Sequence, residues 1–426
     1  MVCGMDSSNP VRNVSAQLQA WSPQAHEVIR QCGRMLAARG LSAYAVGGMV
    51  RDAVLGLPFH GDIDITVVGD GVAAADALAE GLGGNVVTHS QFGTATIRVG
   101  ALNLDVVTAR RESYSSPGAL PSVQPAGLLE DLARRDFTIN AMAVDISPSG
   151  WGELHDPHGG QTDAVAGVIR VLHDGSFHDD PTRMVRALRY ATRLGFRLDV
   201  HTASLLQQRA TGLATLSPSR RWHELERCLQ EQRPDQHLRS LHDLGLLSQL
   251  QGELTLTAAA DVRIARRLRS RYDDPLDASG WLALLCWDAS EPVLDRIADG
   301  LTLPLAYSDV LRAIPAIRDA ALEGRHRAAV YTLLRKMPGA TLSAARYALE
   351  TPEARAEVRA HLALGRFVRP ELRGDDLQRL GVPHGPTVGL YLSALRTARY
   401  REVAKTADEE RWLVADWLLA GGPPND

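Results

Sequence analysis

The first part of the chain alternates between helix-like and strand-like spacings of apolar residues. Residues 22–40 carry apolar positions at helical spacing, with Ser22-Pro23 as a start signal and Gly40 as a stop signal. Strand-like runs occupy residues 43–46, 61–68, 85–89, 95–99 and 102–107, and further helix-like runs occupy 49–57 and 72–82. This mixture predicts an α/β or α+β fold with several short strands.

The pattern changes after about residue 175, where strand-like runs fade and Leu-, Ala- and Arg-rich segments of helical spacing continue to the end. The Asp- and Pro-containing segments 271–279 and 366–376 are candidate joints between helical parts. The Pro/Gly/Ser-rich segment 113–127 predicts an unusually long loop, and such loops are often functional. We therefore expect an α/β N-terminal part followed by a larger all-α part.

Composition narrows the class of protein only slightly. The 426 residues are 45% hydrophobic and 23% charged, which supports sizeable cores and argues against disorder. Four scattered cysteines fit a reducing compartment and argue against a disulfide scaffold or a zinc ribbon. No apolar run reaches roughly 18 residues and the first residues do not form a signal peptide, so we expect a cytoplasmic protein with no membrane partner. The net charge of −4 argues only weakly against a nucleic-acid partner, because the local distribution of charge matters more.

The strand-like run 61–68, GDIDITVV, places two carboxylates on one face. Side chains alternate along a strand, so Asp62, Asp64 and Thr66 share one side while Ile and Val fill the other. Neighbouring carboxylates raise each other's pKa unless a positive charge lies between them, and oxygen ligands suit Mg²⁺. The alternative is that both aspartates are solvated at a strand end or cap a turn. Asp105, in the strand LNLDVVT, is the candidate third acid of a two-metal site, although it can also be a simple strand-edge acid.

A glycine pair precedes this strand in VGGMVRD, residues 46–52. Glycine lets a ligand approach the backbone, and the helix that begins there presents free N–H groups suited to phosphate. Arg51 on the first turn can add charge-assisted hydrogen bonds. A glycine pair alone can be only a tight turn, but its combination with Arg51 and the acidic strand indicates a site for phosphates and metal ions.

A basic helix is predicted in HDDPTRMVRALRYATRLGF, residues 178–196, with Asp180 as a possible N-cap and Pro181 as the first helical residue. Arginines recur every three or four residues and fall within an arc of about 120°; they are Arg183, Arg186, Arg189, Arg193 and Arg197. Residues 181–227 contain nine arginines and three acidic residues, and no nearby acid offsets this face. The stripe suits a triphosphate or a nucleic-acid backbone, with solvated arginines as the alternative.

These segments together resemble the class II tRNA nucleotidyltransferases and bacterial poly(A) polymerases of the polymerase-β-like superfamily. The matching stretches, in the expected order, are GGMVRD, GDIDI, LDVVTARRE, EDLARRDFTINAMA, DPHGG and HDDPTRMVRALRYATRLGF, with GDDLQRLGVPHGPTVG near the C-terminus. The resemblance implies a polymerase-β-like nucleotidyltransferase head followed by a helical neck, body and tail. We expect these parts over residues 22–172, 173–232, 233–365 and 366–426.

The resemblance also implies roles for individual residues. Asp62 and Asp64 would hold Mg²⁺ and, with Asp105, form the catalytic acids. Asp180 and Arg183 would read the incoming base, although Asp179 stands where the family usually has Glu. The residues that would contact the nucleotide elsewhere are Gly48, Arg51, Arg135, Arg186 and Arg189. The alternative for Arg135 and its charged neighbours in Arg134-Arg135-Asp136 is a set of helical charges that pair with each other and with solvent.

The chemistry of a base-reading Asp/Arg pair is consistent with selection of cytosine and adenine. Aspartate accepts hydrogen bonds and arginine donates them, which matches the amino group and ring acceptors of C and A. Uracil and guanine present a carbonyl where the aspartate needs a donor, so buried polar groups would be left unpaired.

The implied activity is template-independent addition of C, C and A to the 3′ end of tRNA from CTP and ATP, assisted by two Mg²⁺ ions. The helical part would bind the tRNA elbow by shape and phosphate contacts. A full-length loop over residues 108–130 favours complete CCA addition, since CC-adding relatives have it shortened. The alternatives are CC-only or A-only addition, poly(A) synthesis, or a non-catalytic tRNA-binding protein; the sequence does not determine the oligomeric state.

Overall fold

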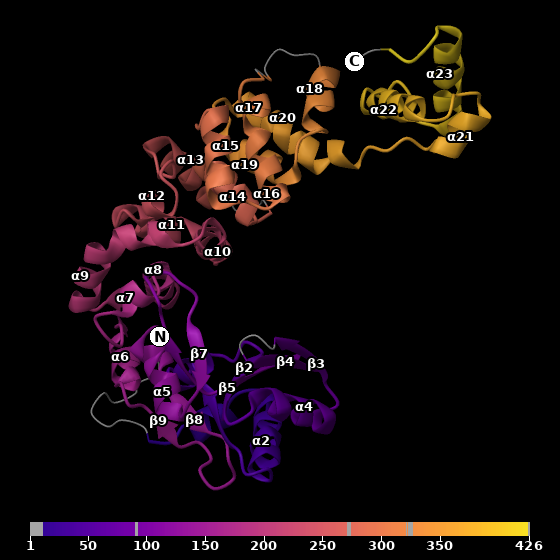
Figure 1. The fold of residues 1–426 in the computed structure, drawn as a ribbon. Helices are drawn as coiled ribbons and strands as arrows, with labels where there is room; N and C mark the ends of the chain where they lie inside the picture. Colours follow the sequence, from indigo (N-terminus) through magenta and orange to yellow (C-terminus); the bar gives the residue numbers. More distant parts are fainter. Residues whose placement is uncertain (1–11, 90–92, 271–273, 321, 323–326, 425–426) are drawn as a thin grey trace. The chain divides into compact units, whose positions relative to one another are not determined.

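The computed structural model describes residues 12–89, 93–270, 274–320, 322 and 327–424, and its chain forms two compact units (Figure 1). Unit 1 comprises Met1–Glu224 with Asp243–Leu250, and unit 2 comprises Leu225–His242 with Gln251–Asp426. The finer division into head, neck, body and tail stays a prediction.

Unit 1 is built on a mixed seven-stranded sheet in the order β3-β4-β5-β2-β1-β8-β9. Its strands are β1 (Ser42–Val46), β2 (Asp62–Val68), β3 (Asn85–His89), β4 (Thr94–Val99), β5 (Leu102–Thr108), β8 (Ala143–Asp145) and β9 (Leu154–His155). Strands β2 and β5 are parallel, and the other neighbouring pairs are antiparallel. The five strands expected from the hydrophobic pattern are all present, so the α/β (α+β) class is confirmed for this part.

The helices that accompany the sheet are α1 (Ser15–Gln19), α2 (Pro23–Ala37), α3 (Gly48–Val54), α4 (Gly71–Leu82), α5 (Leu128–Ala133) and α6 (Gly160–Ala166), with a 3-10 turn, η2 (Thr138–Asn140). Three of these helices, α2, α3 and α4, were predicted, and the others were not. The Ser22 hydroxyl accepts a hydrogen bond from the Ala25 amide and Pro23 is the first helical residue, as predicted. Helix α3 ends at Val54, three residues earlier than the pattern suggested.

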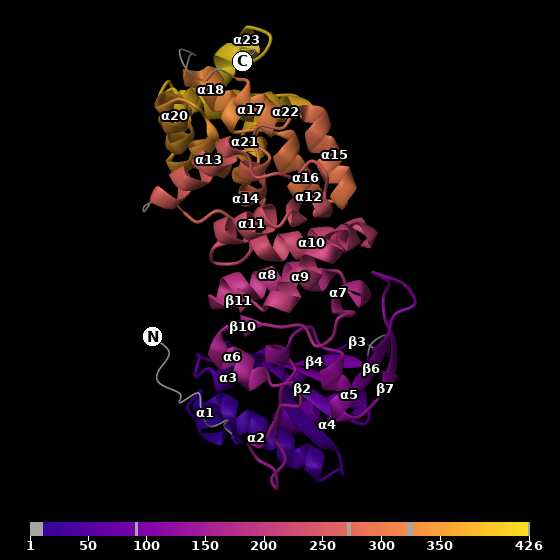
Figure 2. The ribbon, with the colours of Figure 1, turned by 90° about the vertical axis from the view of Figure 1, so that its left-hand side faces the viewer.

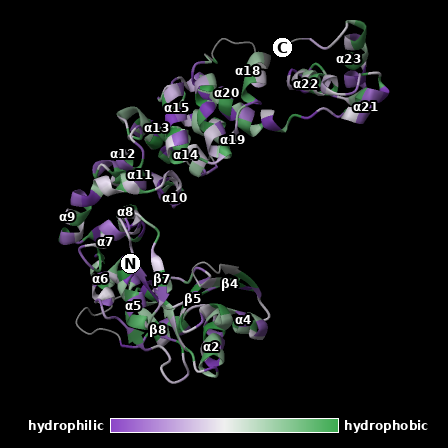
Figure 3. Ribbon diagram, viewed as in Figure 1, coloured by the Kyte–Doolittle hydropathy of each residue, from purple (hydrophilic) through white to green (hydrophobic). Residues whose placement is uncertain are grey.

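The two faces of the sheet have different roles. One face packs against α2, α3 and α4 in a core that includes Ile63, Ile65 and Leu104. Figure 2 gives a second view of these helices, and Figure 3 shows α4 as largely hydrophobic. On the opposite face Val46 packs with Leu132 of α5. The alternation of β2 therefore turns its aspartates away from the main core, as its sequence predicted.

The predicted long loop over residues 113–127 is only partly a loop. Strand β6 (Arg110–Ser113) pairs with β7 (Ser122–Pro125) in a separate antiparallel hairpin. The Arg111 guanidinium binds the side-chain oxygen of Gln124 across this pair. The turn-forming residues in the segment concealed this strand, because its pairing partner rather than its own composition fixes it.

The rest of unit 1 contains short helices, as the sequence predicted after about residue 175, and one small parallel strand pair, which it did not predict. They are β10 (Val168–Ile169), α7 (Ser176–Asp179), α8 (Thr182–Leu194), β11 (Arg197–Leu198), α9 (Val200–Arg209), η3 (Ala210–Thr215), the first part of α10 (Pro218–Leu229), and α12 (Leu246–Leu250). Helix α8 begins after Pro181, one residue later than expected. It ends at Leu194 and is followed by Gly195 in the left-handed conformation. Arg197 therefore lies on β11 and does not belong to the helix.

Unit 2 contains only helices within the described residues, which confirms the predicted all-α class. Besides the end of α10 they are α11 (Pro234–Asp243), α13 (Ala258–Arg269), α14 (Ala278–Leu285), α15 (Glu291–Leu301), α16 (Leu305–Arg312), α17 (Ile314–Arg318), α18 (Arg327–Leu334), α19 (Gly339–Ala348), α20 (Pro352–Ala363), η4 (Gly365–Phe367), α21 (Gly374–Arg379), α22 (Pro386–Tyr400) and α23 (Ala407–Leu419). Helices α21, α22 and α23 share a core around Leu377, Leu395 and Val414. Among the helices that can be described, none is both long and apolar enough to cross a membrane.

Candidate functional site

The polar face of the sheet brings two of the predicted acids into register. Asp64 on β2 lies opposite Asp105 on β5, because these two strands are parallel neighbours. Thr96 on β4 donates a hydrogen bond to Asp105 at 2.6 Å. Asp62 is exposed at the start of β2 and accepts a hydrogen bond from the Asn103 side chain at 3.1 Å. The sheet thus presents three carboxylates along two adjacent strands.

The Asp64 carboxylate has an unusual environment. Burial raises its pKa to about 6, and Asp105 and Asp62 act in the same direction while Arg135 opposes them. Each nearby acid disfavours the charged form of the next, and Arg135 offsets this effect only in part. This environment fits a cation at Asp62 and Asp64, whose oxygen donors suit Mg²⁺. Within the described residues, however, no three acidic, histidine or cysteine side chains converge as a closed metal cage.

The glycine pair lies directly beside these acids. Gly47 has φ 72°, and a Cβ there would lie 3.1 Å from Nη1 of Arg135 and 3.9 Å from Oδ2 of Asp64. A side chain at this position would therefore fill the space between an arginine and a carboxylate. Gly48 begins α3. Both glycines line the cleft described below, and their role in ligand binding stays a prediction.

Arg51 is almost completely buried, with 3% of its surface exposed. Its guanidinium binds Oδ1 of Asp52 through Nε and Nη2, and Oδ1 of Asn140 through Nη1. It also lies over the ring of Tyr190, at 5.5 Å from the ring centroid. These contacts fix the start of α3 against the segment after α5, so Arg51 has a supporting place in the structure as well as a predicted ligand-binding role.

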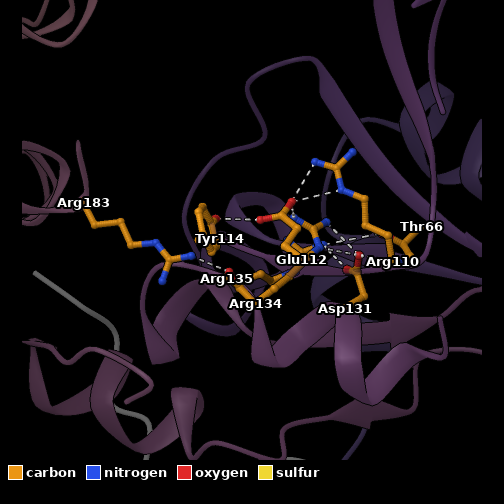
Figure 4. A network of polar contacts seen from close by, with 8 residues as sticks. All are labelled: Thr66, Arg110, Glu112, Tyr114, Asp131, Arg134, Arg135 and Arg183. Atoms are coloured by element: carbon orange, nitrogen blue, oxygen red, sulfur yellow. Dashed lines mark hydrogen bonds and ion pairs between the residues drawn. The ribbon is translucent and has the colours of Figure 1, made fainter. Parts of the chain in front are cut away.

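A network of charges connects the end of α5 to the hairpin (Figure 4). The buried Asp131 carboxylate pairs with Arg134 at 2.7 Å and Arg135 at 2.8 Å. Arg134 also forms an ion pair with Glu112 on β6, and Glu112 accepts a hydrogen bond from the Tyr114 hydroxyl at 2.9 Å. Helix α5 ends at Ala133, so these arginines lie in the turn after it and not on the helix. These arginines pair with Asp131 and Glu112, whereas Asp136 pairs with Arg186.

The arginines of α8 do not form an open cationic stripe. Arg183 and Arg189 are 5% and 4% exposed, and the acids that neutralise this helix come from distant parts of the sequence. Arg186 forms a 2.6 Å ion pair with the buried Asp136, and Arg189 lies 3.6 Å from Glu224. The expectation that no acid offsets this face was therefore wrong. Sequence distance concealed the partners, since Asp136 follows α5 and Glu224 lies on α10.

The predicted base-reading pair is held from both sides of the α7–α8 junction. Arg183 donates to the Ser176 hydroxyl at 2.8 Å and to the Arg134 carbonyl at 2.6 Å. Asp180 precedes α8 and accepts hydrogen bonds from the amide and hydroxyl of Thr182. Arg220 on α10 forms a 2.9 Å ion pair with the same carboxylate. Arg183 is therefore held by α7 and the turn after α5, and Asp180 by the first residue of α8 and by α10.

These elements enclose a cleft of about 350 Å³ within unit 1. Its lining residues are Gly47, Gly48, Asp64, Glu112, Tyr114, Arg134, Arg135, Asp136, Asn140, Asp180, Arg183, Arg186 and Tyr190. Six of the ten predicted site residues line it. Arg51 and Arg189 are outside the lining but contact Tyr190, while Asp62 and Asp105 extend along the sheet from Asp64.

Several lining residues were not among the predicted site residues. Tyr190 lies in contact with the guanidinium groups of Arg51, Arg186, Arg189 and Arg193. Its position on the arginine-bearing side of α8, four residues after Arg186, is a signal that could have identified it. Tyr114 and Glu112 depend on the unpredicted hairpin, so the sequence pattern gave no comparable signal.

Comparison with known proteins gives consistent matches. Residues 43–170 match the family model described as the poly A polymerase head domain, and residues 195–256 match one described as a probable RNA and SrmB-binding site of polymerase A. The A-adding tRNA nucleotidyltransferase of Halalkalibacterium halodurans is 41% identical over 256 residues, which are 59% of each chain. The CC-adding tRNA nucleotidyltransferase of Deinococcus radiodurans is 35% identical over 383 residues, 88% of this chain and 89% of the relative.

A solved structure extends the similarity over almost the whole chain. The Thermotoga maritima CCA-adding enzyme complexed with tRNA has a TM-score of 0.71 and 28% identity, and the match covers 96% of this chain and 99% of the other. The relatives thus differ in which nucleotides their names say they add, and the fold of this chain is similar to that of the solved CCA-adding enzyme.

Proposed function

The chain belongs to the tRNA nucleotidyltransferase family, and we propose that it adds C, C and A to the 3′ end of tRNA from CTP and ATP. The observation that carries this proposal is the cleft of unit 1 described above. An acid of the sheet, Asp64, and the base-reading candidates Asp180 and Arg183 line the same space as a group of arginines. That combination suits a nucleoside triphosphate, which needs a cation site, phosphate ligands and a polar edge for its base.

The phosphates would bind at the end of the cleft formed by the glycine pair and the arginines. Gly48 opens the backbone to the ligand, and Arg135 and Arg186 line the space. Arg51 and Arg189 support this group through their contacts with Tyr190. Four arginines line the cleft, but four carboxylates partly neutralise them, so the ligand must compete with existing ion pairs for Arg186 and Arg135.

Asp62 and Asp64 would hold Mg²⁺, with Asp105 as the third acid beside them. Mg²⁺ bound there would supply Lewis-acid stabilisation of the phosphate charge and favour ionisation of the attacking hydroxyl. In the proposed reaction the tRNA 3′ hydroxyl attacks the α-phosphate and pyrophosphate leaves. The protein contributes orientation and electrostatic complementarity, and no covalent intermediate with a side chain is needed.

Asp180 and Arg183 would select the base. Their opposite hydrogen-bonding characters match the amino groups and ring acceptors of cytosine and adenine, and both side chains line the cleft. Their contacts to Ser176, Thr182 and the Arg134 carbonyl support a preorganised site, which costs little ordering when the nucleotide binds. The tRNA itself would be bound chiefly by the helical part, through shape and phosphate contacts. A tRNA substrate is consistent with the Thermotoga relative, which was solved in complex with tRNA.

A-only addition is the second candidate, and the 41% identical Halalkalibacterium relative is the observation that favours it. The hairpin argues against the third possibility, CC-only addition. The family resemblance associates a shortened loop with CC-only addition, whereas here β6 and β7 form a complete hairpin. We therefore infer that A is among the nucleotides added, whether or not C is added as well.

Three tRNA transcripts test these alternatives, ending before the first C, after the first C and after CC. Each is incubated with CTP alone and with ATP alone. CCA addition predicts that the first two transcripts gain C only from CTP, and that the third gains a single A from ATP. Extension of only the third transcript would establish A-only addition. Long A tails on unrelated RNA would overturn both readings in favour of poly(A) synthesis.

A further inference from the structure

The Asp180 carboxylate uses its two oxygens unequally. Within the described part of the chain, all of its side-chain hydrogen bonds fall on Oδ1. These come from the Thr182 amide at 3.1 Å, the Thr182 hydroxyl at 2.8 Å and Nη2 of Arg220 at 2.9 Å. One oxygen is therefore held by the protein, and Oδ2 is left to accept a hydrogen bond from a ligand in the cleft that Asp180 lines.

Arg220 also binds a segment more than a hundred residues earlier. Its Nη1 donates to the Gly118 carbonyl at 2.7 Å, while Nη2 holds Asp180. Gly118 belongs to the turn between β6 and β7. A single guanidinium thus connects the tip of the hairpin to the carboxylate at the start of α8.

The hairpin tip is closely packed where Arg220 binds it. Gly118 has φ 72°, which favours glycine, and a Cβ there would lie 2.8 Å from the Thr215 hydroxyl and 3.5 Å from a Leu216 methyl carbon. The tip therefore lies against the end of η3 and the residue that follows it. Any larger residue at position 118 would have to move the tip or this segment.

We propose that Arg220 is a positioning residue for base selection: it fixes Oδ1 of Asp180, leaves Oδ2 for the base, and makes this arrangement depend on a seated hairpin tip. The inference rests on the proposed function and adds a residue to it. Arginine suits the role because its planar fork can bind two acceptors at once, which lysine cannot reproduce with the same geometry. Loss of either acceptor contact would let the Asp180 carboxylate rotate and accept a wrong base edge.

The test compares Arg220→Ala, Arg220→Lys and Gly118→Ala with the wild-type protein in two measurements. The first is the ratio of kcat/KM for the correct nucleotide, CTP or ATP according to the transcript, to that for UTP and for GTP. The second is hydrogen–deuterium exchange of residues 114–121. A ratio of rates is insensitive to a partly unfolded fraction, because that fraction lowers both rates equally.

The proposal predicts that Arg220→Ala lowers selectivity by at least about tenfold and accelerates exchange of the hairpin tip, with a partial effect in Arg220→Lys. Gly118→Ala should shift both readouts in the same direction while Arg220 remains in place. The double variant of Arg220→Ala and Gly118→Ala should be no less selective than Arg220→Ala alone, because both changes break one link.

Two matched controls separate this link from general damage. Arg209→Ala removes an exposed arginine at the end of α9. Gly40→Ala places a side chain at a nearly equal φ of 73°, with nothing within 4 Å. Both should keep wild-type selectivity and wild-type exchange at residues 114–121.

The outcomes are distinguishable. Wild-type selectivity in Arg220→Ala or in Gly118→Ala overturns the inference, as does lost selectivity with unchanged exchange of the tip. If these failures occur in a protein that extends tRNA correctly, the proposed function stands without the inference. A wild-type protein that adds no nucleotide to any RNA overturns the proposed function, and the role of Arg220 in base selection fails with it.

Discussion

Asp64 lies directly across from Asp105 on adjacent parallel strands, and both side chains are on the face of the sheet that points away from the main core. The register between β2 and β5 is what makes these two carboxylates direct neighbours on the sheet. Burial and the two neighbouring acids raise the pKa of Asp64, and Arg135 offsets this effect only in part. A ligand that brings positive charge would complete this arrangement.

Replacement of Asp64 should separate catalysis from stability. Asp64→Asn is expected to lower kcat for nucleotide addition by at least about 100-fold, as loss of a key electrostatic group does. The metal-free protein should melt at the same or a higher temperature, because a buried like-charge repulsion is removed. Thermal melts in chelator and single-turnover assays measure the two effects. Asp76→Asn, at an exposed position on α4, is the matched control; a fall in melting temperature that parallels the lost activity would contradict this account.

The ion pair between Arg186 and Asp136 should be important for stability. Asp136 is 8% exposed, so Arg186→Ala leaves a buried carboxylate without its guanidinium. We expect a loss of about 2–4 kcal/mol in the free energy of unfolding, measured by urea denaturation. Addition of Asp136→Asn should recover part of this loss, because the unpaired charge is then absent.

The exposed Arg197 provides the control for that experiment. It continues the arginine spacing of α8 in the sequence but lies on β11. Arg197→Ala should change the free energy of unfolding by less than about 0.5 kcal/mol. Equal losses in the free energy of unfolding for Arg186→Ala and Arg197→Ala would show that the ion pair with Asp136 does not stabilise the fold.

The pH dependence of stability should include a contribution from Asp131. Burial disfavours its charged form, but Arg135 and Arg134 outweigh this effect and hold the pKa below its ordinary value of 3.8. A lowered folded-state pKa gives stability that is present above the unfolded-state pKa and is lost as pH falls through the folded-state value. Asp131→Asn should therefore cost about 2–4 kcal/mol near neutral pH, and the difference from wild type should shrink below pH 3.8. A difference that stays constant between pH 7 and the acid transition would contradict the ion-pair origin.

The two base-reading candidates should respond differently to truncation. Arg183 is buried and donates to the Ser176 hydroxyl and the Arg134 carbonyl, so Arg183→Ala should lower both the melting temperature and kcat/KM for every nucleotide. Asp180→Ala removes a less buried group and should chiefly reduce discrimination of C and A from U and G. Parallel nucleotide-competition assays and thermal melts distinguish the two patterns. Unchanged discrimination in Asp180→Ala would exclude its reading role.

The sequence predicted those features that depend on local periodicity. The alternation in GDIDITVV correctly separated the core residues of β2 from its acids, and Ser22-Pro23 correctly marked the start of α2. The five expected strands of the sheet follow from the same kind of signal. The register that places Asp64 beside Asp105 needed the order of the strands, which periodicity alone does not provide.

Features that depend on distant partners could not be predicted in this way. The arginines of α8 looked unpaired because Asp136 and Glu224 lie far from them in sequence. The Pro- and Ser-containing composition of β7 predicts a loop, but its pairing with β6 outweighs that local preference. Arg220 had no local signal at all, since its significance comes from two acceptors on separate segments.

The most direct test of the central claim is sequencing of 3′ ends after one reaction. A tRNA transcript that ends before the first C is incubated with the wild-type protein, Mg²⁺ and all four nucleoside triphosphates in equal amounts. We predict that the extended molecules end in CCA and that extension then stops. Runs of A, frequent U or G, or no extension of any transcript would contradict the account.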